Sequence, residues 1–180
     1  MAILPLVIAP DARLNVPSQK VEVIDDKLRA FARDLLDTMY ANDGIGLAAV
    51  QVGVHQRIIA VDVARREGGH DPQIFINPEI LEGDAELSVY MEGCLSFPDQ
   101  FSEVERPAGV TVRYLTEHGE EKVIRAEGIL ATCLQHEIDH TNGIVFVDHI
   151  SKLKRDMIIK KLTKAKKLGL VHELPEGVSN

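Results

Sequence analysis

The chain has 180 residues, a formal net charge of −8, 45% hydrophobic residues and 27% charged residues. These values are ordinary for a globular protein, and the length fits one domain, which we expect to span 1–180. Thirteen glycines, eight prolines and two cysteines exclude a collagen-like chain, a low-complexity chain and a disulfide scaffold. No apolar stretch approaches the ~20 residues that cross a bilayer, and the N-terminus lacks the basic start of a signal peptide. We therefore expect a cytoplasmic protein without a membrane partner.

The hydrophobic pattern predicts three helices and a central group of strands. Residues 1–20 contain three prolines and are expected to be extended. From Asp25 to Met39 the apolar residues recur with helical spacing, which predicts a helix that stops at 42–44. Further along the chain, strand character follows at 44–63, 74–83 and 109–128, and helical character at 129–142 and 150–168. Strands in the middle with helices at both ends predict the α+β class, with antiparallel or mixed strands.

The strongest chemical signal is the pentapeptide HEIDH at 136–140, inside the second predicted helix. His136 and His140 are four residues apart, so they project from one helix face and can bind one divalent cation. Glu137 points off that face but can reach a water molecule on the metal, as in metalloprotease helices. The alternative interpretation is two surface histidines on an ordinary helix.

A catalytic metal site also needs a third protein ligand and an open position. Phe146 occupies the third-histidine position of the extended metzincin pattern and cannot bind a metal, and Glu173 lies in a polar tail. Cys133 is seven residues from His140, about 10.5 Å along a helix, which is far for a shared ion. Cys94 lies in a turn, but a lone cysteine is equally typical of a buried, inert thiol. The residues alone leave these alternatives open.

Three motifs resemble the signatures of the peptide deformylase family, in their order and with similar spacing. They are GIGLAAVQVG at 44–53, EGCLSFP at 92–98 and QHEIDHTNG at 135–143, and PDARL at 10–14 is similar to the start of that family. Two residues depart from the family pattern, because Thr141 stands where many members have Leu and Phe101 where some have Arg.

The resemblance implies a metal centre of Cys94, His136 and His140 with a metal-bound water. The family typically uses Fe(II) and also accepts Zn(II) or Ni(II). The implied reaction is hydrolysis of the formyl group from the N-terminal formylmethionine of newly synthesised polypeptides, which releases formate. A zinc endopeptidase and a non-catalytic metal-binding module are the competing hypotheses.

The resemblance also implies roles for the residues around this centre. Glu137 would move the proton of the attacking water to the leaving amine. The Gln51 side-chain amide and the Leu95 backbone N–H would lie beside the oxyanion. Gly46 and Gly93 would let extended backbone segments pair with the peptide as an added strand does.

Helix geometry predicts part of a substrate pocket. Ile129 and Cys133 fall on the same helical stripe as His136 and His140. With Ile45 they would form an apolar slot for a methionine side chain. Simple core packing is the alternative for Cys133.

A basic segment ends the chain. Residues 151–168 hold eight lysines and arginines against one aspartate, a net charge of +7, so the remainder is at −15. Their apolar stripe, expected to pack on the body of the protein, is Leu153, Met157, Ile158 and Leu162. Such a helix is typical of a solvated surface, but it would also suit docking to the phosphate-rich ribosome. We expect no DNA partner, since the net charge is −8, and we expect a flexible tail over 169–180.

Overall fold

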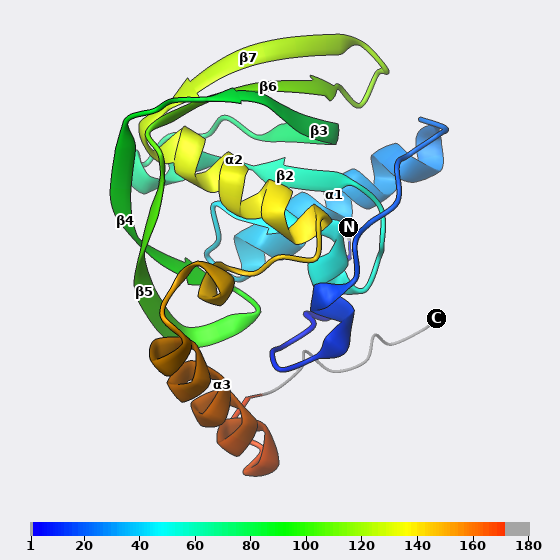
Figure 1. Cartoon of the computed structure of the whole chain (residues 1–180). Coiled ribbons are helices and arrows are strands. Elements are labelled where there is room, and N and C mark those ends of the chain that lie inside the picture. Colours follow the sequence, from blue (N-terminus) through cyan, green and yellow to red (C-terminus); the bar gives the residue numbers. More distant parts are fainter. Residues whose placement is uncertain (1, 172–180) are drawn as a thin grey trace.

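Helix α2 (Gly128–Thr141) runs through the centre of the protein, between a five-stranded sheet and a two-stranded hairpin (Figure 1). The structure is a computed structural model that describes residues 2–171. The other elements are α1 (Asp26–Ala41), β1 (Gly46–Ala48), β2 (Ile58–Val61), β3 (Gln73–Gly83), β4 (Leu87–Cys94), β5 (Phe97–Pro107), β6 (Gly109–Leu115), β7 (Glu121–Glu127) and α3 (Lys152–Lys167). Short 3-10 helices are η1 (Ala12–Asn15), η2 (Ala49–Val52), η3 (Val63–Glu67) and η4 (Phe146–His149). The predicted α+β class is confirmed.

Helix α1 forms where the sequence predicts it. The Asp25 side chain accepts a hydrogen bond from the Leu28 N–H at 2.9 Å, which satisfies one of the free donors of the first turn. Leu28, Leu35 and Met39 are buried on one side of the helix, against β1 and β2. The helix ends at Ala41, and the N–H of the capping residue Asn42 reaches back to the Met39 and Tyr40 carbonyls.

The five-stranded sheet has the order β1-β2-β3-β6-β7, and every neighbouring pair is antiparallel. Strand β2 is buried along its whole length because α1 contacts it from one side and α2 from the other. Its residues, Ile58–Val61, are accordingly all apolar. Strand β1 lies at the sheet edge, so within residues 2–171 one of its sides has no strand partner.

The β4–β5 hairpin forms the second sheet, and its turn carries Cys94. Regular pairing continues to Gly93 opposite Phe101, and an irregularity then brings Cys94 opposite Phe97. This irregularity places the cysteine at the tip of the hairpin, where the strand turns toward α2.

The N-terminal segment ties this tip to the rest of the site. The Val7 N–H donates to the Gln51 carbonyl at 2.7 Å, and the Ala9 N–H donates to the Ser96 carbonyl at 2.8 Å. The segment is mostly extended, as predicted, but residues 12–15 form η1, because the Asp11 side chain caps them through the Arg13 N–H.

Helix α3 packs on the body through fewer residues than predicted. Ile158 and Leu162 are buried, whereas Leu153 and Met157 are 72% and 52% exposed. The expectation of one stripe along the whole helix is therefore wrong, because the body covers only the middle of α3. Within the described residues no helix is long and apolar enough to cross a membrane. Of the expected flexible tail, residues 172–180 lie outside the described residues.

Leu162 is buried and Leu153 is exposed, and this difference gives a stability prediction. Leu162→Ala should lower the free energy of unfolding by about 2–5 kcal/mol, since it leaves a cavity under α3. Leu153→Ala, on the exposed side of the same helix, should change it by no more than about 0.5 kcal/mol. Urea unfolding followed by circular dichroism measures both. Equal losses in the two variants would contradict the observed packing.

Candidate active site

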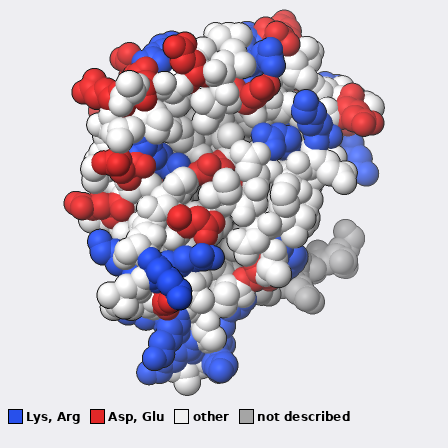
Figure 2. Space-filling view, in the orientation of Figure 1, with Lys and Arg blue, Asp and Glu red and all other residues white. Residues whose placement is uncertain are grey.

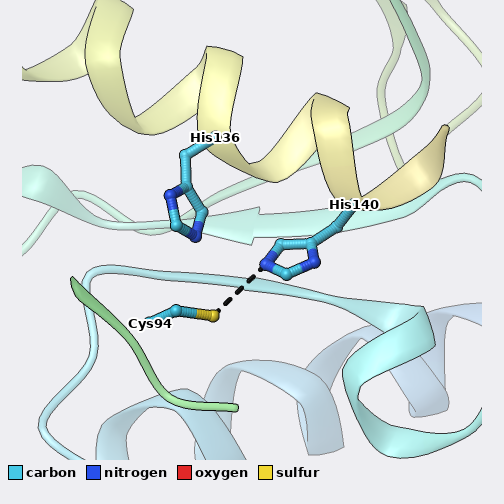
Figure 3. Close-up of side chains that lie close together, drawn as sticks. All are labelled: Cys94, His136 and His140. Carbon is cyan, nitrogen blue, oxygen red and sulfur yellow. Dashed lines mark hydrogen bonds between the residues drawn. The ribbon is translucent and has the colours of Figure 1, made fainter. Parts of the chain in front are cut away.

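Cys94, His136 and His140 form a compact cluster of metal-binding groups. One ligand atom from each side chain lies within 4.8 Å of the other two. Figure 3 shows both imidazoles projecting from α2 toward the cysteine, with Cys94 Sγ at 3.4 Å from His140 Nε2. The structure thus brings together the three residues that the family resemblance implied as ligands. A thiolate and two imidazoles at this separation fit a divalent transition metal and leave one coordination position open.

Glu92 orients the first histidine of the cluster. Its Oε1 lies 2.8 Å from His136 Nδ1, which leaves Nε2 to face the cysteine. Arg106 holds the same carboxylate with two hydrogen bonds, at 2.7 Å from Nε and 3.0 Å from the second terminal nitrogen. Burial raises the pKa of Glu92, but the hydrogen bonds from His136 and Arg106 outweigh it and lower this pKa to about 2. A charged carboxylate therefore stands behind the histidine.

Arg106 also connects the hairpin to α2. Its other terminal nitrogen donates to Asp139 Oδ2 at 2.8 Å, and the same oxygen lies 2.7 Å from His149 Nε2 in η4. This network therefore joins β4, β5, α2 and η4. We define it as the Arg106 network, made of Glu92, Arg106, His136, Asp139 and His149.

The two histidines of the cluster differ in how they bind protons. Burial holds the pKa of His140 well below its usual range, so the ring is neutral, as a metal ligand must be. Burial also opposes protonation of His136, but hydrogen bonds to Cys94 and Glu92 overcome it and raise this pKa. His136 thus holds a proton more readily than His140 does, and metal binding at such a site displaces it.

Glu137 is buried beside the cluster, against strand β1. Within the described part of the chain, its Oε2 has no hydrogen-bond partner, and burial raises its pKa to about 7. Gly46 makes this approach possible, because a Cβ there would lie 2.6 Å from Glu137 Oε1 and 2.8 Å from Cys133 Sγ. The carboxyl group is therefore available to a molecule in the cavity.

Gln51 is held in one orientation by three hydrogen bonds. Its Oε1 accepts from the Ala48 N–H at 2.9 Å. Its Nε2 donates to Cys94 Sγ at 3.3 Å and to Ser96 Oγ at 3.1 Å. The donor end of the buried amide therefore faces the cysteine turn.

A cavity of about 870 Å³ opens beside the cluster. Its lining includes every substrate-binding residue that the sequence predicted, namely Ile45, Gly46, Gly93, Ile129 and Cys133. Gln51, Cys94, Leu95, His136 and Glu137 line it as well, whereas His140 does not. We define this space as the main cavity.

The two departures from the family pattern lie in different places. Phe101 lines the main cavity and is 65% exposed. Its ring packs on Gly93 so closely that a Cβ atom at position 93 would lie 2.5 Å from a ring carbon of Phe101. Thr141 is buried, and its hydroxyl donates to the Ile138 carbonyl at 2.6 Å. Thr141 thus affects helix packing, while Phe101 changes the surface that a ligand meets.

Several residues of the site were not predicted from the sequence. Glu92 lies two residues before Cys94 in the same strand, so strand periodicity would have placed both on one face. Arg106 and Asp139 carry no local signal, because their roles follow from strand pairing and from the contact between the hairpin and α2. Tyr90 and Arg66, which also line the main cavity, are likewise defined by tertiary contacts.

The chain is similar in sequence and in fold to known proteins. The sequence profile of the polypeptide deformylase family matches residues 3–156. The chain belongs to the polypeptide deformylase family. Peptide deformylases from Rhizobium meliloti and Agrobacterium fabrum are each 54% identical to it, over 93% and 92% of this chain and 96% and 97% of theirs. The crystal structure of peptide deformylase from Ehrlichia chaffeensis superposes with a TM-score of 0.87 at 43% identity, covering 94% of this chain and 100% of that one.

The deformylase match contains all of the predicted site residues and ends inside α3. The first turn of α3 therefore belongs to the matched region, and most of the lysine-rich helix follows it.

The Arg106 network gives a second stability prediction. Arg106→Leu should lower the free energy of unfolding by about 3–5 kcal/mol, because it removes the guanidinium that pairs with the buried Glu92 carboxylate. Arg113→Leu, which removes a guanidinium from an exposed pair with Glu79, is the matched control and should have little effect. Urea unfolding of the metal-free proteins measures both. An Arg106 variant as stable as the control would show that the network does not hold the hairpin to α2.

Proposed function

We propose that the protein is a metal-dependent hydrolase that removes the formyl group from the N-terminal formylmethionine of newly synthesised polypeptides and releases formate. The observation that carries this proposal is the Cys94, His136 and His140 cluster beside Glu137, in the main cavity of a polypeptide deformylase. The cytoplasm, where new polypeptides emerge, is the proposed location.

Cys94, His136 and His140 would hold the metal, and we propose Fe(II), with Zn(II) or Ni(II) as substitutes in the purified protein. One soft thiolate and two imidazoles suit each of these ions. When bound, the ion supplies Lewis acidity, which lets a water molecule ionise near neutral pH. Glu92 and the rest of the Arg106 network would keep the His136 ring in its ligating orientation.

Glu137 would carry the proton through the reaction. It takes a proton from water as the water oxygen attacks the formyl carbon. It then gives this proton to the amide nitrogen as the carbon–nitrogen bond breaks, because an unprotonated amine is too basic to leave. The buried, unpartnered Oε2 and the pKa of about 7 support this role.

Gln51 and Leu95 would stabilise the negative charge that develops on the formyl oxygen. The Gln51 amide already directs its donor end at the cysteine turn, so no reorientation is required during the reaction. Leu95 follows Cys94 in that turn and lines the main cavity, where its backbone N–H would act as the second donor.

The peptide would lie between two strand edges. Among residues 2–171, strand β1 pairs only with β2 and strand β4 only with β5, so an extended chain can add to either strand, at Gly46 and at Gly93. Ile45, Ile129 and Cys133 would then surround the methionine side chain.

We further propose that α3 docks the protein to the ribosome. Figure 2 shows its lysines and arginines gathered at the lower end of the molecule, where α3 lies. The −15 charge on the rest of the chain would be repelled by phosphates, so a +7 helix supplies the attraction that docking requires. The Lys166 side chain already makes an intramolecular contact, since its Nζ donates a hydrogen bond to the Ile8 carbonyl at 2.9 Å, so we leave it out of the test below.

Metal binding and turnover should separate in two variants. Cys94→Ser should lose most of its metal, because a hydroxyl replaces a thiolate ligand. Glu137→Gln should keep the metal and lose formate release, because it removes the proton carrier and spares the three ligands. Elemental analysis and a formate-release assay on formyl-Met-Ala, with iron-loaded protein purified without oxygen, measure the two effects. Wild-type metal content in Cys94→Ser would overturn the ligand set, and casein cleavage without formate release would favour an endopeptidase.

The docking proposal predicts a salt-dependent interaction with ribosomes. The test variant replaces four exposed lysines of α3 with glutamine, namely Lys160, Lys161, Lys164 and Lys167. It should co-sediment less with ribosomes while it hydrolyses formyl-Met-Ala as wild type does. Binding of the unaltered protein should weaken steeply between about 50 and 200 mM salt.

A control variant replaces exposed lysines outside α3 with glutamine, at Lys20, Lys27 and Lys122. It should co-sediment as wild type does. Equal losses in both variants would mean that total charge, rather than α3, governs binding.

A further inference from the structure

Two cavities meet at one wall near the protein surface. A second cavity of about 340 Å³ lies next to the main cavity, and three residues line both. They are Arg66, Tyr90 and Ile129. The second cavity therefore begins where the predicted methionine pocket ends, because Ile129 belongs to that pocket.

Arg66 and Tyr90 close the wall by contacting each other. The Arg66 guanidinium donates a hydrogen bond to the Tyr90 hydroxyl, and its carbon lies 5.5 Å from the centre of the tyrosine ring. Arg66 comes from η3 and Tyr90 from β4, so the contact joins the segment after β2 to the hairpin. Arg66 is exposed and Tyr90 half-buried, and the contact between them is made by their side chains.

The apolar lining continues behind this wall. Val61, Val63, Ala64 and Leu130 line the second cavity, with Glu67, Asp71 and Gln73 as its polar members. An unbranched apolar side chain that passed Ile129 would thus meet further apolar surface, provided that the Arg66–Tyr90 contact were absent. With the contact in place, entry would have to break this hydrogen bond and displace the half-buried Tyr90 ring.

We propose that Arg66 and Tyr90 form the end wall of the pocket for the first side chain and so limit that side chain to about the length of methionine. The inference rests on the proposed function, since it places this side chain between Ile45, Ile129 and Cys133. Removing the wall joins the two cavities and extends the pocket, which shifts the preference toward longer unbranched side chains.

The test compares two substrates in three variants. The substrates are formyl-Met-Ala and formyl-2-aminodecanoyl-Ala, whose first side chain is an unbranched octyl group. Tyr90→Ala and Arg66→Ala should raise the ratio of kcat/KM for the long substrate over formyl-Met-Ala by about tenfold or more, the discrimination that an apolar pocket gives per methylene. Tyr90→Phe, which keeps the ring and loses the hydroxyl, should raise it less. The ratio does not depend on the fraction of folded enzyme, since both substrates meet the same sample.

Arg113→Ala is the matched control, because it removes an arginine that pairs with Glu79 on the exposed sheet surface. It should keep the wild-type ratio. A wild-type enzyme that releases no formate from formyl-Met-Ala would overturn the proposed function. Normal release together with an unchanged ratio in both Tyr90→Ala and Arg66→Ala would overturn the end wall alone.

Discussion

The buried guanidinium of Arg106 is the interaction on which the candidate site depends. Its side chain is only 5% exposed, and a charge so far from water is tolerated only when its partners are fixed around it. The partners are Glu92 on β4 and Asp139 on α2, two elements with more than thirty residues of chain between them. Satisfying this one cation therefore sets the distance between hairpin and helix. That distance in turn brings the cysteine at the hairpin tip to the histidines.

The central position of α2 follows from the same arrangement. One side of the helix carries Leu134 and Ile138 into the sheet core, while another carries the histidines toward the hairpin. The helix is apolar toward the sheet and polar toward the hairpin. Without the hairpin, its polar side would face water. Gly46 completes the fit, since only a residue without a Cβ lets β1 approach Glu137 and Cys133 this closely. The main cavity lies between α2, strand β1 and the β4–β5 hairpin.

Local patterns predicted the parts of this fold that local interactions determine. Helix α1, the β6–β7 hairpin and the paired histidines of α2 each depend on residues close in sequence, so periodicity and spacing were sufficient. Cys94 could be assigned as the third ligand only through the family resemblance, because its distance from α2 depends on the Arg106 network. The prediction that Leu153 and Met157 pack on the body of the protein was wrong for a related reason. A sequence shows that a helix is amphipathic but not how far the body beneath it extends.

The reversal of the chain after α3 joins two regions that the sequence keeps apart. Gly169 adopts a left-handed conformation with φ of 66°, and the Leu170 N–H returns to the Ala165 carbonyl at 3.0 Å. Leu170 and Val171 then line the main cavity. In a deletion series from the carboxyl end, the removal of Val171 is thus the step that begins to change the cavity wall described above. Shortening the chain past that residue takes away part of the cavity wall before it reaches the lysines, so in such truncated proteins a loss of turnover would carry no information about docking.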